Sequence, residues 1–252
     1  ELSEITRWLP VDVSDEEVRD TLWHKTLFPG IIPMTTTTLA IEQAAARQVL
    51  RLAVQQMQER YPGTGMNFEP IFAGGSVLAN APSPVQSLMI LLDGLQPTGV
   101  TSIFLDPYGL MAALGAIAPA NTVLPVQILE SGAFINLAWV ISPVSDARPG
   151  SLLMRLRLEY EDGSEQRLDV RQGALVPLPV RHGQAVKVYL KDVAYGVRVD
   201  PRLTRGGLKI YGGVCGAFAD ARGRPLVLPT DAVKRRETLL RWSAAFETRR
   251  TA

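Results

Sequence analysis

The residues whose types and spacing could do chemistry are a glycine pair, Gly74-Gly75, and an aspartate, Asp106. Each follows a short apolar run, at 70–73 and at 100–105, and each run is followed by a helical pattern. Apolar runs of this length between turn residues are typical of strands buried on both faces, as in a parallel sheet. Ligands of open α/β sheets bind outside the carboxyl ends of the strands, where the glycine pair and the aspartate would lie.

Each of these features also has a simpler interpretation. Glycine lacks a Cβ, so the pair lets the backbone turn with positive φ and lets another molecule come close, but a lone pair can equally be a tight turn. Asp106-Pro107 repeats the helix start Ser83-Pro84, in which the first residue caps the helix and proline occupies its first turn. Asp106 is therefore either a helix cap or a residue that holds a metal or a nucleotide. The pattern leaves both questions open.

The remaining reactive side chains form no recognisable catalytic cluster. Cys215 lies in the apolar run 210–218, which predicts a small buried side chain. His24 and His182 have no cysteine or carboxylate neighbours at ligand spacing. The sequence therefore predicts no catalytic residue and no metal site.

The composition limits the classes of partner. Of the 252 residues, 46% are hydrophobic and 20% charged, as in a globular protein with one large or two modest domains. A net charge of +1 gives no reason to expect a nucleic acid or a membrane surface as partner. No apolar stretch approaches the ~18 residues that a membrane span needs. No secretory signal is visible, so we expect a cytoplasmic protein. The first residue is Glu rather than Met, which suggests a chain cut from a longer one.

Residues 1–119 are expected to form the first domain, which combines helices with the two strands that carry the candidate site. A capping box predicts that Ser14 starts one helix, and Thr37 or Thr38 is expected to cap the next, at 39–60. The latter helix has apolar residues on two stripes, which indicates burial against more than one neighbour. The predicted class of this part is α/β.

Residues 120–252 are expected to form a second, β-rich domain. Turn residues at 161–164 predict a hairpin between two alternating strands, and 220–225 is interpreted as another hairpin turn. Gly212-Gly213 is interpreted as a bulge or a barrel corner. The pattern predicts an antiparallel β-barrel or sandwich that ends in a helix at 230–246. The expected strands are 123–129, 134–141, 152–160, 166–170, 185–190 and 208–214.

The order strand, Gly-Gly, helix, strand, helix resembles the adenosine motif of the actin, sugar-kinase and heat-shock ATPase superfamily. In that motif the glycine pair approaches the adenine and ribose of a bound nucleotide. The resemblance thus implies that Gly74 and Gly75 contact ATP on its adenosine side, and it makes Ser76 and Asp106 further candidates for nucleotide binding.

A second resemblance covers nearly the whole chain and is to the glutamate mutase L (MutL) family. It implies the C-terminal part of an actin-like ATPase superfamily protein, of reactivase or chaperone type, that assists adenosylcobalamin-dependent mutases. Its partners would be such a mutase or the N-terminal half of the parent chain. The segments that carry the resemblance are 22–25, 29–33, 39–47, 72–78, 105–110, 212–214 and 220–226.

The chain departs from the superfamily pattern on the phosphate side. The Asp-x-Gly-Thr hairpin that is the superfamily's first phosphate motif is not found in the sequence. Phosphoryl transfer needs charge stabilisation and metal positioning around the γ-phosphate, so we expect no ATP hydrolysis by this chain alone. The alternative function is a non-catalytic interaction module of unknown role, and a sugar-kinase fragment is disfavoured by the long β-rich extension.

Overall fold

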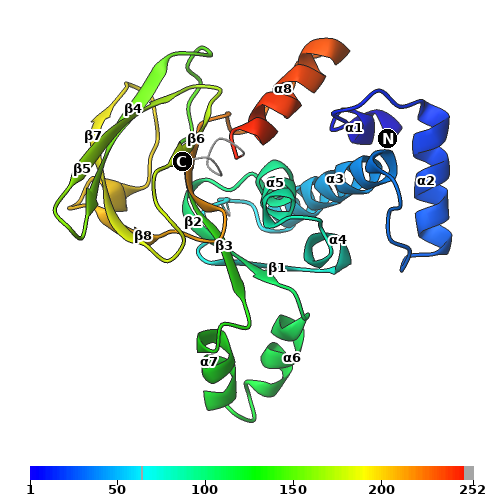
Figure 1. Cartoon of the computed structure of the whole chain (residues 1–252), viewed down its shortest axis with the longest axis horizontal. Coiled ribbons are helices and arrows are strands. Elements are labelled where there is room, and N and C mark those ends of the chain that lie inside the picture. The colour runs from blue at the N-terminus through cyan, green and yellow to red at the C-terminus, as the bar shows by residue number, and fades with distance from the viewer. Residues whose placement is uncertain (64, 247–252) are drawn as a thin grey trace. The chain divides into compact units, whose positions relative to one another are not determined.

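A computed structural model describes residues 1–63 and 65–246 as a mixed α/β protein with two sheets (Figure 1). The described helices are α1 (Leu2–Thr6), α2 (Asp15–Leu27), α3 (Thr36–Arg60), α4 (Ser76–Ala79), α5 (Pro84–Leu95), α6 (Leu110–Ile117), α7 (Val123–Glu130), α8 (Ala232–Ala244) and the 3₁₀ turn η1 (Pro201–Leu203). The strands are β1 (Ile71–Gly74), β2 (Gly99–Asp106), β3 (Ile135–Ser142), β4 (Leu152–Tyr160), β5 (Glu165–Arg171), β6 (Leu175–Leu178), β7 (Ala185–Val193), β8 (Leu208–Tyr211) and β9 (Gly216–Asp220).

The chain divides into two compact units. Unit 1 consists of Glu1–Thr64, Met89–Gln96 and Leu226–Ala252, and unit 2 of Gly65–Leu88 and Pro97–Pro225. Helix α5 therefore begins in unit 2 and ends in unit 1.

Unit 1 is helical, and its helices α2, α3 and α8 begin at side-chain caps. The Ser14 hydroxyl accepts a hydrogen bond from the Glu17 amide at 3.2 Å, as the capping box predicts. Helix α3 begins earlier than expected, because Thr35 and Thr38 form a reciprocal capping box in which each side chain bonds the other's amide. The prediction of Thr37 or Thr38 as the cap was therefore wrong.

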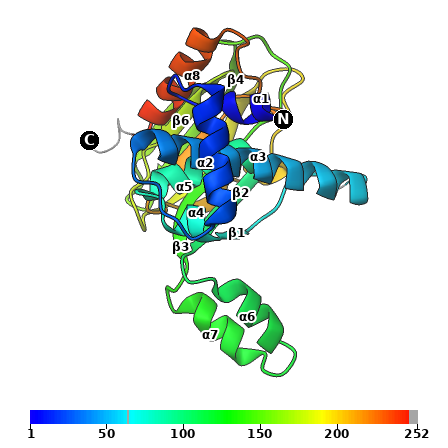
Figure 2. The same ribbon diagram turned by 90° about the vertical axis from the view of Figure 1, so that its right-hand side faces the viewer.

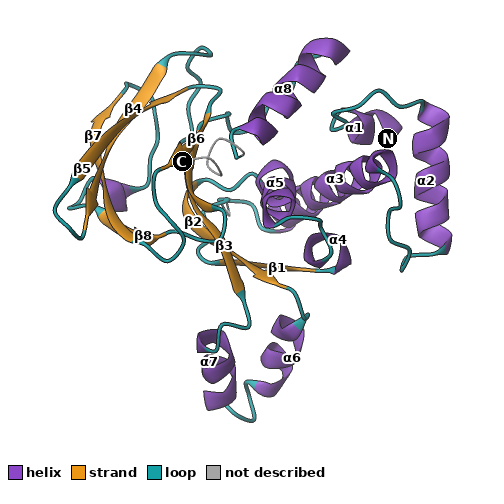
Figure 3. Cartoon of the chain, viewed as in Figure 1, coloured by secondary structure: helices purple, strands orange, loops and turns teal. Residues whose placement is uncertain are grey.

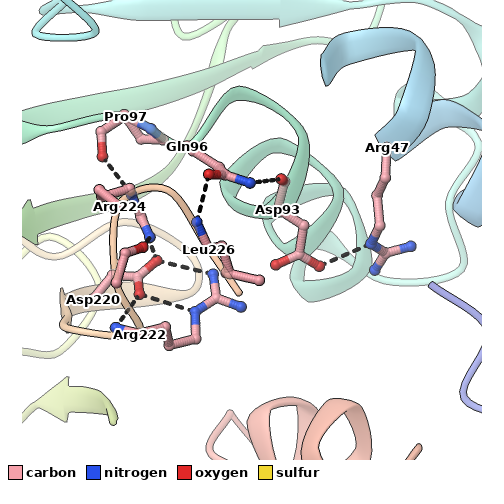
Figure 4. A network of polar contacts seen from close by, with 9 residues as sticks. Arg47, Asp93, Gln96, Pro97, Asp220, Arg222, Arg224 and Leu226 are labelled. Carbon is pink, nitrogen blue, oxygen red and sulfur yellow. Dashed lines mark hydrogen bonds and ion pairs between the residues drawn. The ribbon is translucent and has the colours of Figure 1, made fainter. Parts of the chain in front are cut away.

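Helix α3 and the last turn of α5 pack closely within unit 1. A Cβ on Gly94 would lie 2.7 Å from Leu50 Cβ, so only glycine permits this approach. Arg47 Nε donates to Asp93 Oδ2 at 2.8 Å, and the aspartate is almost fully buried (Figure 4). The arginine side chain therefore links α3 to α5 within this unit.

Unit 2 contains a five-stranded sheet of order β1-β2-β3-β9-β6. Strands β1 and β2 are parallel, as predicted from their apolar runs, and Ile71 pairs with Ile103 and Gly74 with Asp106. β3 is antiparallel to β2, whereas β9 is parallel to β3. This sheet takes strands from both sides of residue 119, and the division into domains at 119/120 stays a prediction.

The second sheet of unit 2 is antiparallel, with the order β5-β4-β7-β8 (Figure 3). The predicted hairpin at 161–164 joins β4 and β5, and Arg155 pairs across it with Asp169 at 3.1 Å. One apolar cluster contains residues of both sheets, among them Val100, Ile141 and Leu156. In the described residues neither sheet closes on itself, so the structure shows two packed sheets and no barrel.

Two predicted β features are wrong. Residues 123–129 form helix α7, because the side-chain oxygen Oδ1 of Asn121 accepts from the amides of Val123 and Leu124, both at 3.0 Å, and caps the first turn of the helix. The segment 220–225 is no hairpin turn. Asp220 ends β9 between its two neighbouring strands, and the described chain from 221 to 231 forms no further strand.

Helices α6 and α7 form a hairpin that extends away from the five-stranded sheet in both views (Figures 1 and 2). Neither helix has a buried residue. Residues 107–129 carry no charged side chain, and Val123 and Val126 are more than half exposed. The hairpin is therefore an exposed apolar element. Of the described helices, none combines the length and hydrophobicity that crossing a bilayer requires.

Candidate functional site

The glycine pair lies at the carboxyl edge of the five-stranded sheet. Gly74 is the last residue of β1 and is in register with Asp106, the last residue of β2, so both strand ends meet at one edge. Gly75 follows with φ 107° and ψ 154° and is the N-cap of α4. Both glycines are exposed. The expected placement of these residues at the ends of parallel strands is thus what the structure shows.

The two glycines differ in what surrounds them. A Cβ on Gly75 would meet no described atom within 4 Å, whereas a Cβ on Gly74 would lie 3.4 Å from the Asp106 carbonyl oxygen. The backbone of Gly75 is in a region that is essentially restricted to glycine. Bare peptide at this position therefore faces open space, which a side chain would fill. This arrangement fits a flat ligand lying against the chain.

Asp106 acts as a cap for the segment that follows it. Its Oδ1 accepts from the amides of Leu110 at 2.9 Å and Tyr108 at 3.3 Å, and its Oδ2 accepts from Met111 at 2.8 Å. The side chain is buried, which acts to raise the pKa of its carboxyl, but these amide hydrogen bonds outweigh burial and lower the pKa. The capping interpretation is confirmed, although α6 itself begins only at Leu110. A direct role of Asp106 in nucleotide binding stays a prediction.

Two exposed side chains flank this edge. Ser76 is the exposed first residue of α4, directly after the glycine pair, and its role in binding stays a prediction. Tyr108 is 75% exposed and lies in the turn that the Asp106 carboxylate holds. Tyr108 was not among the site residues predicted from the sequence. The signal that could have indicated it is its position directly after the end of a predicted strand.

The other reactive residues take structural positions. Cys215 is 7% exposed, as its apolar run predicts. His24 packs edge-on against Phe28, with ring centroids 5.2 Å apart. Lys25 pairs with Glu42 at 2.5 Å and donates to the Ile31 carbonyl at 2.7 Å. Within residues 1–63 and 65–246, no three His, Cys, Asp or Glu side chains are grouped as metal ligands would be.

A buried charge cluster was missed by the sequence reasoning. Asp220 Oδ2 accepts from Arg222 Nη2 at 2.9 Å and from Arg224 Nη2 at 2.6 Å (Figure 4). Arg224 Nε donates to the Pro97 carbonyl at 2.9 Å. Burial acts to raise the pKa of Asp220, but the two guanidinium groups outweigh it and hold the pKa well below its usual range. The alternating Asp-x-Arg-x-Arg pattern after an apolar run is the signal that could have indicated it.

Comparison with known proteins gives one match. The family model described as MutL protein matches residues 1–132, slightly more than half of the 252 residues and including the whole glycine edge. Searches of curated proteins and of solved structures returned no match. The chain therefore belongs to the MutL family, which confirms the resemblance to glutamate mutase L proteins.

Proposed function

We propose that the chain is the adenosine-binding part of a nucleotide-dependent accessory protein, of reactivase or chaperone type, for an adenosylcobalamin-dependent mutase. Membership of the MutL family supports the link to a mutase. The observation that carries the nucleotide part is the exposed glycine pair, with open space in front of Gly75, at the shared carboxyl edge of two parallel strands. This is where an actin-like ATPase would contact the nucleoside of ATP.

ATP would be bound without being hydrolysed by this chain alone. The chain contains no Asp-x-Gly-Thr hairpin, and the described residues form no metal-binding cluster beside the glycine edge. The phosphate-side residues would come from another segment or from a partner. Phosphate release in the presence of ATP and Mg²⁺ should therefore not exceed the rate measured without protein.

Calorimetric titration with ATP and with adenosine tests the proposal. We expect saturable binding of both, and a loss of affinity of at least tenfold in Gly75→Val, because the side chain would occupy the open space before the backbone. Gly163→Val is the matched control, since Gly163 has φ 81°, no described atom within 4 Å of its Cβ position, and lies in the β4–β5 turn. Absence of saturable binding to the unmodified chain, or equal affinities of the two variants, would contradict the proposal.

The exposed apolar hairpin α6–α7 favours a second candidate, a protein-interaction module. The hairpin buries none of its helical residues and carries no charge between 107 and 129, so it could dock on an apolar surface of the mutase. Val123→Lys with Val126→Lys should lower affinity for the purified mutase and leave ATP affinity unchanged. If these changes leave mutase affinity unaltered, the hairpin is not the contact.

A further inference from the structure

An exposed aromatic side chain lies in the turn beside the glycine edge. Tyr108 follows the last residue of β2 by two positions, and 75% of its surface is exposed. A tyrosine ring is a large apolar surface, which folding commonly buries at least in part. Most of this ring is therefore open to a ligand.

The side chain of Asp106 connects this turn to the glycine pair. Gly74 and Asp106 are paired across the two parallel strands, and a Cβ on Gly74 would lie 3.6 Å from the Asp106 Cβ and 3.8 Å from its Oδ2. The other carboxylate oxygen, Oδ1, accepts from the Tyr108 amide at 3.3 Å. One carboxylate is thus adjacent both to the bare position on β1 and to the backbone that carries the tyrosine. The turn therefore lies on the face of the sheet toward which a side chain at position 74 would point.

The same carboxylate holds the backbone of the turn in one conformation. It also accepts from the amides of Leu110 at 2.9 Å and Met111 at 2.8 Å. Between them, Gly109 has φ 68°, a conformation that glycine adopts at no steric cost. A tyrosine on a fixed backbone has only two side-chain torsions left to order, so a ligand that packs on its ring is bound at low entropic cost.

The surroundings of the ring favour a flat, uncharged group over a phosphate. Residues 107–129 contain no charged side chain, so the segment that carries Tyr108 offers no cation to an anion. A Cβ on Gly75 would meet no described atom within 4 Å, so the neighbouring peptide is also open and flat. Every nucleobase has a π-face that can stack on an aromatic side chain. The base of a nucleotide is therefore the part that fits between these two surfaces.

We propose that Tyr108 binds the base of the nucleotide by stacking, with the base held between the Tyr108 ring and the bare peptide of Gly74-Gly75. The proposal rests on the proposed nucleotide function and assigns the residue that recognises the base. Stacking uses the face of a base and not its hydrogen-bonding edge, so it does not distinguish adenine from guanine. Binding of ATP and of GTP should therefore depend on Tyr108 to the same extent.

Calorimetric titration of ATP and GTP into Tyr108→Ala tests this assignment. We expect the affinity for both nucleotides to fall roughly tenfold, as for the loss of one base stack on an aromatic side chain. Tyr108→Phe keeps the ring and should keep both affinities. Tyr195→Ala is the matched control, since Tyr195 is fully exposed in the loop after β7, and its removal should change neither affinity.

A fluorescent base reports the stack directly. The triphosphate of 2-aminopurine riboside loses fluorescence when its base stacks on an aromatic ring. At saturating concentrations of protein, the unmodified chain and Tyr108→Phe should quench this fluorescence, whereas Tyr108→Ala should not.

The outcomes separate this inference from the function on which it rests. If ATP binds and binding responds to Gly75→Val, but Tyr108→Ala keeps the original affinity, the inference alone is overturned. Quenching that persists in saturated Tyr108→Ala overturns it as well. If the unmodified chain binds no ATP, the inference and the proposed function both fall.

Discussion

Replacing Asp220 by asparagine is expected to destabilise unit 2 by roughly 3–5 kcal/mol, because it removes one partner from a buried ion cluster. The side chains of Asp220 and Arg222 are fully buried, and that of Arg224 is 3% exposed. Besides its two contacts through Oδ2, the carboxylate accepts from Arg222 Nε through Oδ1 at 2.9 Å. Asparagine keeps the shape but leaves the guanidinium groups buried without this negative charge.

Asp169→Asn provides a matched control on an exposed ion pair. Asp169 lies 3.1 Å from Arg155, and the two side chains are 45% and 52% exposed. Exposed pairs of this kind contribute about 1 kcal/mol or less. Hydrogen exchange with mass spectrometry at increasing urea concentration gives the free energy of opening separately for peptides of β3, β6 and β9. Equal values for the two variants would refute the argument from the buried cluster.

The dependence on pH gives a second check on Asp220. Its pKa is lower in the folded protein than in the unfolded chain, so the stabilisation that it supplies is complete above the unfolded value of about 4. The stabilisation is lost as the pH falls below that value toward the folded pKa. The difference in stability between the unmodified chain and Asp220→Asn should therefore be constant from pH 5 to 8 and narrow in acid. A difference that stays constant down to pH 2 would contradict the assigned ion pairing.

Three further substitutions are expected to change stability in urea denaturation. Gly213→Ala should cost more than about 2 kcal/mol, because its Cβ collides with the β3 backbone, whereas Gly115→Ala in the open face of α6 should stabilise slightly. Thr35→Ala should cost about 1 kcal/mol through loss of the α3 cap, and Thr36→Ala close to nothing. Asp106→Ala should cost roughly 1–2 kcal/mol near neutral pH, and because the pKa of Asp106 is lowered this cost should shrink below about pH 4. Equal costs of Gly213→Ala and Gly115→Ala would contradict the close approach of Gly213 to β3. Equal costs of Thr35→Ala and Thr36→Ala would contradict the cap of α3, and a pH-independent cost at Asp106 would contradict the hydrogen bonds of its carboxylate.

The elements that could be predicted from the sequence are those with strong local signals. The two apolar runs with their turn residues predicted the parallel strands β1 and β2, and the alternation from Met154 onward with the turn at 161–164 predicted β4 and β5. Helix α7 was mistaken for a strand because Val123, Val126 and Ile128 are β-branched. Its capping by Asn121 decides the outcome, and that signal lies outside the apolar run.

The candidate site was predictable only in part, for a physical reason. The glycine edge depends on residues next to two strand ends, so local patterns place it. The Asp220 cluster depends instead on which strands become neighbours in space. The residues near Asp220 in the sequence do not indicate that β9 pairs with β3, so the burial of this cluster could not be predicted from the sequence.

The hairpin α6–α7 leaves and rejoins the five-stranded sheet at a single point, because Leu105 and Ile135 are paired directly across β2 and β3. The segment between these two residues is thus an insertion, because a short reverse turn would suffice to link the two antiparallel strands. We therefore expect that the segment can be replaced by one of another length and sequence while the pairing of β2 with β3 is kept. It is accordingly the natural place in this chain to graft a tag, a fluorophore or the corresponding segment of another MutL protein.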